Sequence, residues 1–191
     1  MAESFAPRRP TPVFARLAII GIGLIGSSIA RAAKELNLAG TIALADRDEA
    51  VRQRARELGL GHAVVETAAE AARDADHVIL CVPVGACGPV AAKIASSLKQ
   101  GAIVSDVGSV KGSVVDAVLP HLPEGVAFVP AHPVAGTENS GPDAGFPSLF
   151  LNRWCILTPP EGTDAAAIAK TRQFWEGMGA LVEVMLSLIH I

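Results

Sequence analysis

The sequence predicts an α/β fold with a doubly wound, mainly parallel β-sheet, and three observations lead to this prediction. Short apolar segments alternate with segments of helical spacing along most of the chain, as in repeated βαβ units. Hydrophobic residues make up 50% of the 191 residues while only 4% are aromatic, which suits a sheet covered by helices on both faces. A glycine-rich turn directly follows the first apolar segment. Right-handed crossovers between consecutive strands complete the expected architecture.

The expected elements follow from hydrophobic periodicity and from the residues that start and stop helices. Strands are expected at residues 17–20, 41–45, 63–65, 77–82, 102–105 and 126–129. Helices are expected between them at residues 24–38, 49–58, 68–73, 90–98 and 110–119. Two late strands at residues 153–158 and 181–185 flank a helix at residues 164–178, and we expect them to extend the sheet. One domain spanning residues 16–185 is therefore predicted.

The two ends of the chain are not expected to belong to this domain. Residues 1–15 contain prolines and arginines but no apolar core of a signal peptide, so we expect a flexible leader. Residues 186–191, Leu-Ser-Leu-Ile-His-Ile, read as a translation of CTG TCT CTT ATA CAC ATC, the end of a sequencing-library transposon. This segment is interpreted as a non-native tail on a truncated reading frame. The alternative is an authentic apolar strand.

Charge and cysteine usage exclude several classes of function. The net charge is −3 without a long run of either sign, so neither nucleic acid nor a membrane surface is an expected partner. The three cysteines lack C-x-x-C spacing and the five histidines lack a metal-ligand pattern. We therefore expect reduced, mostly buried thiols, no metal site, and a cytoplasmic protein that acts on a small molecule.

The glycine-rich turn has the spacing of a dinucleotide-binding site. It matches G-x-G-x-x-G and stands between the first predicted strand and the first helix, where such a motif has a physical role. The first glycine permits the turn, the second lets a pyrophosphate approach the backbone, and the third lets helix pack on strand. The helix N-terminus then faces an anion. The predicted cofactor-binding residues of this turn are Gly21, Ile22, Gly23, Leu24, Ile25 and Gly26.

Asp46 is the predicted partner of the adenosine ribose. It follows the second strand, twenty positions after Gly26, where a carboxylate can accept hydrogen bonds from ribose hydroxyls. The alternative is an ordinary N-cap for the helix that begins at Glu49, and both roles are compatible. The carboxylate favours NAD, whereas the adjacent Arg47 could hold a 2′-phosphate and permit NADP. NAD is the predicted cofactor.

Two further strand ends are expected to border the cofactor. Open α/β sheets bind ligands at the carboxyl edge of their strands, and two short segments fall there. Pro83 could instead be only a strand terminator, and Ser109 could be the N-cap of the next helix. The residues assigned to this edge are Cys81, Val82, Pro83, Asp106, Gly108 and Ser109.

His132 is the predicted general base. It follows a strand end and opens a segment, residues 132–150, that is rich in Gly, Pro, Asn, Asp and Ser and is long for a connector. An imidazole at the ligand edge of a sheet is well placed to take a proton near neutral pH. The alternative is a loop histidine bonded to the backbone.

Four segments together resemble the prephenate/arogenate (cyclohexadienyl) dehydrogenase family. They are GIGLIGSSIA from Gly21, DVGSVKG from Asp106, HPVAGTENSGPDAGF from His132 and RWCILTPP from Arg153, in this order and suitably spaced. The resemblance covers residues 17–185. A generic nicotinamide-binding domain would share only the first segment.

The resemblance implies oxidative decarboxylation of a cyclohexadienol, prephenate or arogenate, in tyrosine biosynthesis. It assigns His132 to the ring hydroxyl as a base and Ser109 to the same hydroxyl and the nicotinamide. Thr137 and Glu138 match motif positions near the mouth of the site and are weaker assignments. The choice between prephenate and arogenate stays open.

The resemblance also implies a second, helical domain that this chain lacks. That domain would supply an arginine for the substrate's ring carboxylate and most of a homodimer interface, so the chain as given is expected to bind cofactor with little turnover. Two other readings remain: a β-hydroxyacid-type NAD(P)-dependent dehydrogenase, and a dinucleotide-binding module without catalysis. The HPVAGTE segment argues against the first.

Overall fold

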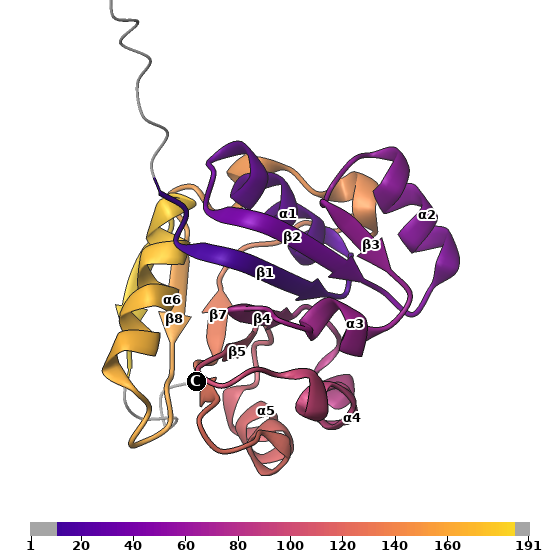
Figure 1. Ribbon diagram of the computed structural model, residues 1–191. Coiled ribbons are helices and arrows are strands. Elements are labelled where there is room, and N and C mark those ends of the chain that lie inside the picture. The colour runs from indigo at the N-terminus through magenta and orange to yellow at the C-terminus, as the bar shows by residue number, and fades with distance from the viewer. Residues whose placement is uncertain (1–10, 186–191) are drawn as a thin grey trace, which may run out of the picture.

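The main sheet contains six parallel strands, as the alternating pattern predicts. The computed structural model describes residues 11–185 (Figure 1). The spatial order of the strands is β3-β2-β1-β4-β5-β6, so the strand order reverses beside β1, where β4 joins it. The strands are β1 (Phe14–Ile20), β2 (Ala39–Ala45), β3 (Ala63–Val65), β4 (His77–Leu80), β5 (Ile103–Asp106) and β6 (Ala127–Phe128).

Strand register brings four strand ends level with one another. Ile20 of β1 pairs with Ala45 of β2 on one side and with Leu80 of β4 on the other. Leu80 in turn pairs with Asp106 of β5. Because all four strands run in the same direction, the loops that follow them open at one carboxyl edge. This is where doubly wound sheets bind ligands.

Helices cover both faces of this sheet and form two separate cores. One core joins the sheet to α1, α2 and α6, and the other joins it to α3, α4 and α5 (Figure 1). Parallel strands with both faces covered are nearly continuous apolar runs, which explains why β4 is buried at every position. The helices are α1 (Leu24–Glu35), α2 (Glu49–Glu57), α3 (Ala68–Ala72), α4 (Val84–Ile94), α5 (Lys111–Val118) and α6 (Ala165–Gly177).

The late strands form a sheet of their own, so the expectation that they extend the main sheet is wrong. β7 (Ala131–Pro133) pairs antiparallel with β8 (Trp154–Leu157), which pairs parallel with β9 (Leu181–Val184). The chain leaves the main ladder after Val129, whose N–H donates to the carbonyl of Val104, and it turns at Pro130. Apolar spacing located β8 and β9 but could not choose their partners, and it missed β7.

Two other boundaries differ from expectation. Helix α4 begins at Val84, six residues before the predicted start, although its first turns contain two glycines and Pro89. Gly88 is needed there because a Cβ atom would lie 2.9 Å from the carbonyl oxygen of Ala117 on α5. Strand β1 begins at Phe14, inside the predicted leader, and that side chain is buried. The predictions for residues 1–10 and 186–191 lie outside the described residues.

The long segment after β7 contains no helix longer than a single 3₁₀ turn. Short 3₁₀ helices occur at Pro142–Ala144 and Pro147–Phe150, and two others follow α4 and α5 at Ala95–Ser97 and Leu119–His121. Within residues 11–185, no helix has the length and apolar character needed to span a membrane.

Candidate functional site

The three glycines of the first turn have different steric surroundings. Gly21 has φ +97°, and a Cβ atom there would lie 2.3 Å from the carbonyl oxygen of Cys81. A Cβ atom on Gly26 would lie 2.0 Å from the carbonyl oxygen of Gly21, so only glycine lets α1 pack this close to the turn. Gly23 has nothing within 4 Å of its Cβ position. The turn is therefore tight at its two ends and open in the middle, where a ligand can approach.

The N-terminus of α1 adds hydrogen-bond donors to this open position. The first amides of a helix have no acceptor within the helix. Gly23 occupies the N-cap position and provides no side-chain cap, and the first turn carries no acidic residue. Ile22 is different, because its N–H donates to Oδ2 of Asp46 at 2.8 Å. The free amides and the helix dipole favour an anion such as a pyrophosphate.

Asp46 belongs to the turn and is not the N-cap of α2. Besides Ile22, its carboxylate accepts from the N–H of Asp48 at 3.0 Å. The N-cap is Asp48, whose side chain accepts from the N–H of Ala50 at 2.8 Å. The capping alternative for Asp46 is therefore wrong. A carboxylate has about four acceptor positions, so two remain for ribose hydroxyls. Arg47 is exposed beside it.

The end of β4 lies directly against the glycine turn. The N–H of Cys81 donates to the carbonyl of Ile20 at 2.7 Å, and Pro83 is the exposed N-cap residue of α4. Strand β4 ends at Leu80, three residues earlier, so Pro83 starts the helix and does not end the strand. All three cysteines are free, as expected, and Cys87 and Cys155 are buried. Burial raises the pKa of the Cys81 thiol, so this thiol is protonated at neutral pH.

A buried ion pair lies beneath the edge at the end of β5. The ammonium of Lys111 donates to Oδ2 of Asp106, and both side chains are 0% exposed. Oδ2 also accepts from the N–H of Gly108 at 2.8 Å, and Oδ1 is buried without a partner. Burial raises the pKa of Asp106 and lowers the pKa of Lys111, and the attraction between them opposes both shifts. The prediction that Asp106 borders the cofactor is corrected: its carboxylate is sealed inside the domain.

Ser109 stands at the tip of the loop that this ion pair closes. The loop runs from Asp106 to Lys111, and Ser109 is exposed. Helix α5 begins at Lys111 with Val110 at the N-cap position and no side-chain cap, so the capping alternative for Ser109 is wrong. A Cβ atom on Gly108 would lie 3.1 Å from the Val84 side chain, which leaves little room for any other residue. The loop therefore presents a free hydroxyl at the carboxyl edge.

His132 lies on the outer face of the second sheet. It pairs with Ile156 of β8, which pairs with Glu183 of β9, so these three side chains share one face. The imidazole is half-buried, and its Nδ1 atom is buried without a partner among the described residues. Burial and, secondarily, the charge of Lys111 lower the pKa of His132, so the ring is neutral at pH 7. A neutral, half-accessible imidazole can accept a proton.

The segment after β7 is fastened to the cofactor helix. Ser28 of α1 accepts from the N–H of Phe146 at 3.1 Å, and Arg31 donates to the carbonyl of Pro142 at 3.3 Å. Arg54 of α2 forms a two-pronged ion pair with Asp143, with its shortest contact at 2.6 Å. These contacts join the segment that follows His132 to α1 and α2, the helices that follow the predicted cofactor-binding residues.

The structure brings the predicted cofactor-binding segments after β1, β2, β4 and β5 to one edge of the main sheet, whereas His132 lies on the second sheet. Thr137 and Glu138 are exposed, and their side chains make no hydrogen bond to His132. Lys111 is the important residue that sequence reasoning missed. A signal was present, because a lysine in the first turn of a helix opposes the helix dipole and needs a nearby carboxylate such as Asp106.

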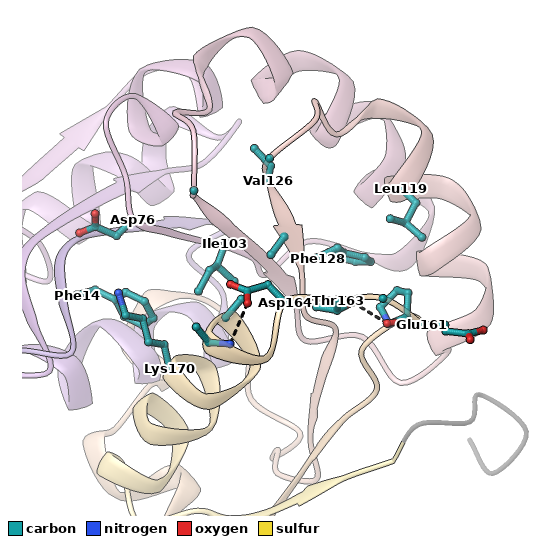
Figure 2. A pocket seen from close by; sticks show the side chains of 17 residues that line it. Phe14, Asp76, Ile103, Leu119, Val126, Phe128, Glu161, Thr163, Asp164 and Lys170 are labelled. Carbon is teal, nitrogen blue, oxygen red and sulfur yellow. Dashed lines mark hydrogen bonds between the residues drawn. The ribbon is translucent and has the colours of Figure 1, made fainter.

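A pocket lies away from this edge. It has a volume of about 480 Å³ and lies near the amino ends of β5 and β6 and the start of α6 (Figure 2). Phe14, Phe128 and Ile103 form apolar walls, and Asp76 and Lys170 contribute charges. None of the predicted site residues lines it. Within residues 11–185, no cluster of three or more His, Cys, Asp or Glu side chains could hold a metal ion.

Comparison with known proteins identifies this region. Residues 29–184 match the family model described as prephenate dehydrogenase, nucleotide-binding domain. A cyclohexadienyl dehydrogenase of Zymomonas mobilis is 49% identical over 178 residues, which are 93% of this chain and 60% of that relative. This chain therefore spans about three fifths of that relative's length.

Two solved structures agree with this match. The Aquifex aeolicus prephenate dehydrogenase in complex with hydroxyphenyl propionate and NAD⁺ has a TM-score of 0.81 and 31% identity, over 89% of this chain and 59% of that one. The Synechocystis arogenate dehydrogenase has a TM-score of 0.82 and 28% identity over the same shares. The chain belongs to the prephenate dehydrogenase family, of which it contains the nucleotide-binding domain.

Proposed function

We propose that this chain binds NAD at its glycine turn and provides the base for the oxidative decarboxylation of prephenate or arogenate. One observation carries the proposal. The open face of Gly23 and the Asp46 carboxylate lie at the carboxyl edge of the main sheet, and the buried Lys111 ties the end of β5 at this edge to β7, which carries the neutral His132. The NAD⁺ complex of the Aquifex aeolicus relative supports the choice of cofactor.

Three groups of this chain fit a dinucleotide. The pyrophosphate would lie over Gly23 and the amides that begin α1, and the ribose hydroxyls would donate to Asp46. A 2′-phosphate would meet the Asp46 carboxylate, and this repulsion favours NAD over NADP. Arg47 is exposed and could reduce the preference.

The proposed reaction moves a hydride, a proton and carbon dioxide. NAD⁺, when bound, supplies the acceptor for the hydride from the ring carbon that carries the hydroxyl. The hydroxyl gives its proton to the base as the hydride leaves, the carbon–carboxylate bond breaks, and the electrons of that bond make the ring aromatic. The phenolic oxygen that results takes a proton back, so no proton is released overall. The products are carbon dioxide, NADH and 4-hydroxyphenylpyruvate from prephenate, or tyrosine from arogenate.

His132 would accept the hydroxyl proton. Its lowered pKa keeps the ring neutral, so it can act as a base at pH 7 without first losing a proton. A positioned base of this kind typically contributes about 10²–10⁴-fold to the rate. The exposed hydroxyl of Ser109, on the neighbouring loop, would hydrogen-bond the same oxygen and orient it.

The substrate pocket would be completed by a region that this chain does not contain. The outer face of the second sheet carries Trp154 and Leu181, which are 53% and 45% exposed and directly paired across β8 and β9. Exposed apolar side chains beside a half-buried imidazole are typical of a surface that another element covers. We infer that the further two fifths of the relatives supply the carboxylate-binding group and the dimer interface. The 191-residue chain alone would then bind NAD with little turnover.

Cofactor binding is tested by calorimetric titration of NAD into the chain, two test variants and one control variant. Gly23→Ala should fold normally, because its Cβ position is open, but bind NAD more weakly because the methyl group occupies the ligand's space. Asp46→Ala should also weaken binding. Asp48→Ala is the matched control: it removes the cap of α2 and about 1 kcal/mol of stability while leaving NAD affinity intact. Equal affinity in all four proteins would refute the site.

Turnover is tested in a chimera that joins this chain to the C-terminal region of the Zymomonas mobilis relative. We expect the chimera to reduce NAD with prephenate or arogenate, and His132→Asn to lower the rate by about 10²–10⁴-fold with NAD affinity unchanged. A folded, NAD-binding chimera that converts neither substrate would favour the reading of a binding module without catalysis.

A further inference from the structure

Lys111 joins the two segments that carry the proposed chemistry. Its ammonium donates to Asp106 and, at 2.7 Å, to the carbonyl oxygen of Ala131, the residue directly before His132. Asp106 ends β5, Lys111 begins α5, and Ala131 begins β7. One buried side chain at the start of α5 therefore connects two strands, β5 and β7, that belong to two different sheets.

The same contacts fix the serine loop. Asp106 and Lys111 are five residues apart, and their ion pair closes the loop between them at its base. The N–H of Gly108 donates to the same carboxylate oxygen of Asp106. This hydrogen bond fixes the first half of the loop. Ser109 follows at the exposed tip. A displacement of Lys111 would thus move Ser109 through the loop and His132 through Ala131.

We propose that Lys111 and Asp106 are positioning residues that set the relative placement of Ser109 and His132. This inference rests on the proposed function for the role of those two side chains, but the geometry itself is independent of it. Replacing a buried pair by apolar groups is often neutral for stability. The pair is therefore better explained by the orientation that it imposes than by a contribution to folding.

Four titratable groups surround His132 from the elements packed against it. Lys111 of α5 and Asp106 of β5 lie beneath it, and the Cys155 thiol of β8 lies near its backbone. Glu183 of β9 shares its face, one strand beyond Ile156. Lys111 lowers the pKa of His132 and Asp106 raises it, with the lysine effect the larger. Loss of the pair should therefore raise this pKa.

The experiment is an NMR titration of the histidine rings in the full 191-residue chain. The resonance of His132 is assigned by its absence in His132→Asn. The test variant is Asp106→Leu/Lys111→Met, which removes both charges and leaves no unpaired charge in the interior. The control, Asp76→Leu/Lys99→Met, removes an ion pair of the same residue types with a 2.6 Å contact at the amino end of β4.

The proposal predicts an upward shift of the His132 pKa in the test variant and altered amide resonances at Ser109 and His132. The control should show neither change. An unchanged His132 titration with unchanged Ser109 and His132 resonances in the test variant would overturn the proposal. A shift as large in the control would do the same.

A second measurement on the unmodified chain keeps the proposal testable if the variant does not fold. A buried ammonium bonded to Asp106 and Ala131 should give a slowly exchanging Nζ–H signal for Lys111. A rapidly exchanging ammonium would contradict the bridge. Neither readout involves turnover or NAD, so failure of the bridge and failure of the proposed function are separable.

Discussion

The two edges of the main sheet contain similar groups in opposite environments. Each edge has an Asp–Lys ion pair next to a histidine. At the amino edge, Lys99 contacts Asp76 at 2.6 Å with side chains 40% and 30% exposed, and His77 next to it is fully buried. At the carboxyl edge the pair Lys111–Asp106 is fully buried, and His132, on β7 of the second sheet next to this pair, is half-accessible.

The partners of the two histidines explain the difference. His77 packs against the rings of Phe14 and Phe174, and its Nε2 atom is 2.9 Å from Oγ of Ser105. Burial lowers its pKa to about 3, so it stays neutral over the physiological range. Within residues 11–185 no aromatic ring stacks on His132, which faces the exposed side of the second sheet. A shifted pKa alone therefore does not mark a functional residue; accessibility at the ligand edge is also required.

The largest expected effect distinguishes the two ion pairs. Lys111→Met should lower the free energy of unfolding by about 3–5 kcal/mol, because it leaves a buried carboxylate without its partner. Lys99→Met should lower it by only about 0–1 kcal/mol, because water solvates the remaining Asp76. Urea unfolding of both variants measures the difference. Equal losses would mean that the two edges are not distinct in burial.

The second prediction concerns acid stability. An unfolded histidine has a pKa of about 6.5, so below this pH the unfolded chain takes up a proton that folded His77 refuses until about pH 3. The contribution of His77 to the free energy of unfolding is therefore fully present above pH 6.5. It falls toward pH 3, by up to about 1.4 kcal/mol per pH unit. His77→Phe/Ser105→Ala, which removes both hydrogen-bond partners together, should flatten this dependence.

His132→Asn provides the comparison for that experiment. Its pKa is lowered in the same direction but it is less buried, so it should remove a smaller part of the slope, beginning at the same pH. Urea unfolding between pH 4.5 and 7.5 measures all three proteins. If His132→Asn flattened the pH dependence of the free energy of unfolding more than the His77 variant does, our assignment of the buried and the accessible histidine would be reversed.

The smallest effect concerns two serines of the same β5 region. Ser105→Ala should cost about 1–3 kcal/mol of stability, because Nε2 of His77 would lose its partner in the interior. Ser109→Ala should change stability by less than about 0.5 kcal/mol, since Ser109 is exposed. In the chimera, turnover should respond in the opposite order: Ser109→Ala should lower the rate more than Ser105→Ala does. A large stability loss in Ser109→Ala would show that its loop is structural.

Much of the fold and half of the site were readable from local sequence. The G-x-G-x-x-G spacing determined the roles of Gly21, Gly23 and Gly26 because steric crowding in a tight turn depends on near neighbours in the chain. Apolar periodicity likewise located every strand of the main sheet, since burial on both faces requires continuous apolar runs. The start of α4 was predicted too late because glycines are typical helix breakers. Gly88 in fact lies inside the helix, where it lets α4 pack closely on α5.

Tertiary structure alone decided the rest. The sequence could not show that β7 leaves the main sheet, that Asp106 is sealed inside, or that Lys111 reaches the carbonyl of Ala131 twenty residues away. Strand partners and buried ion pairs depend on which distant segments meet, and the free energy of a charge depends on whether water reaches it. Sequence by itself thus located the glycine turn and predicted His132 as the base, and only the assembled fold showed that Lys111 bonds to the residue before His132.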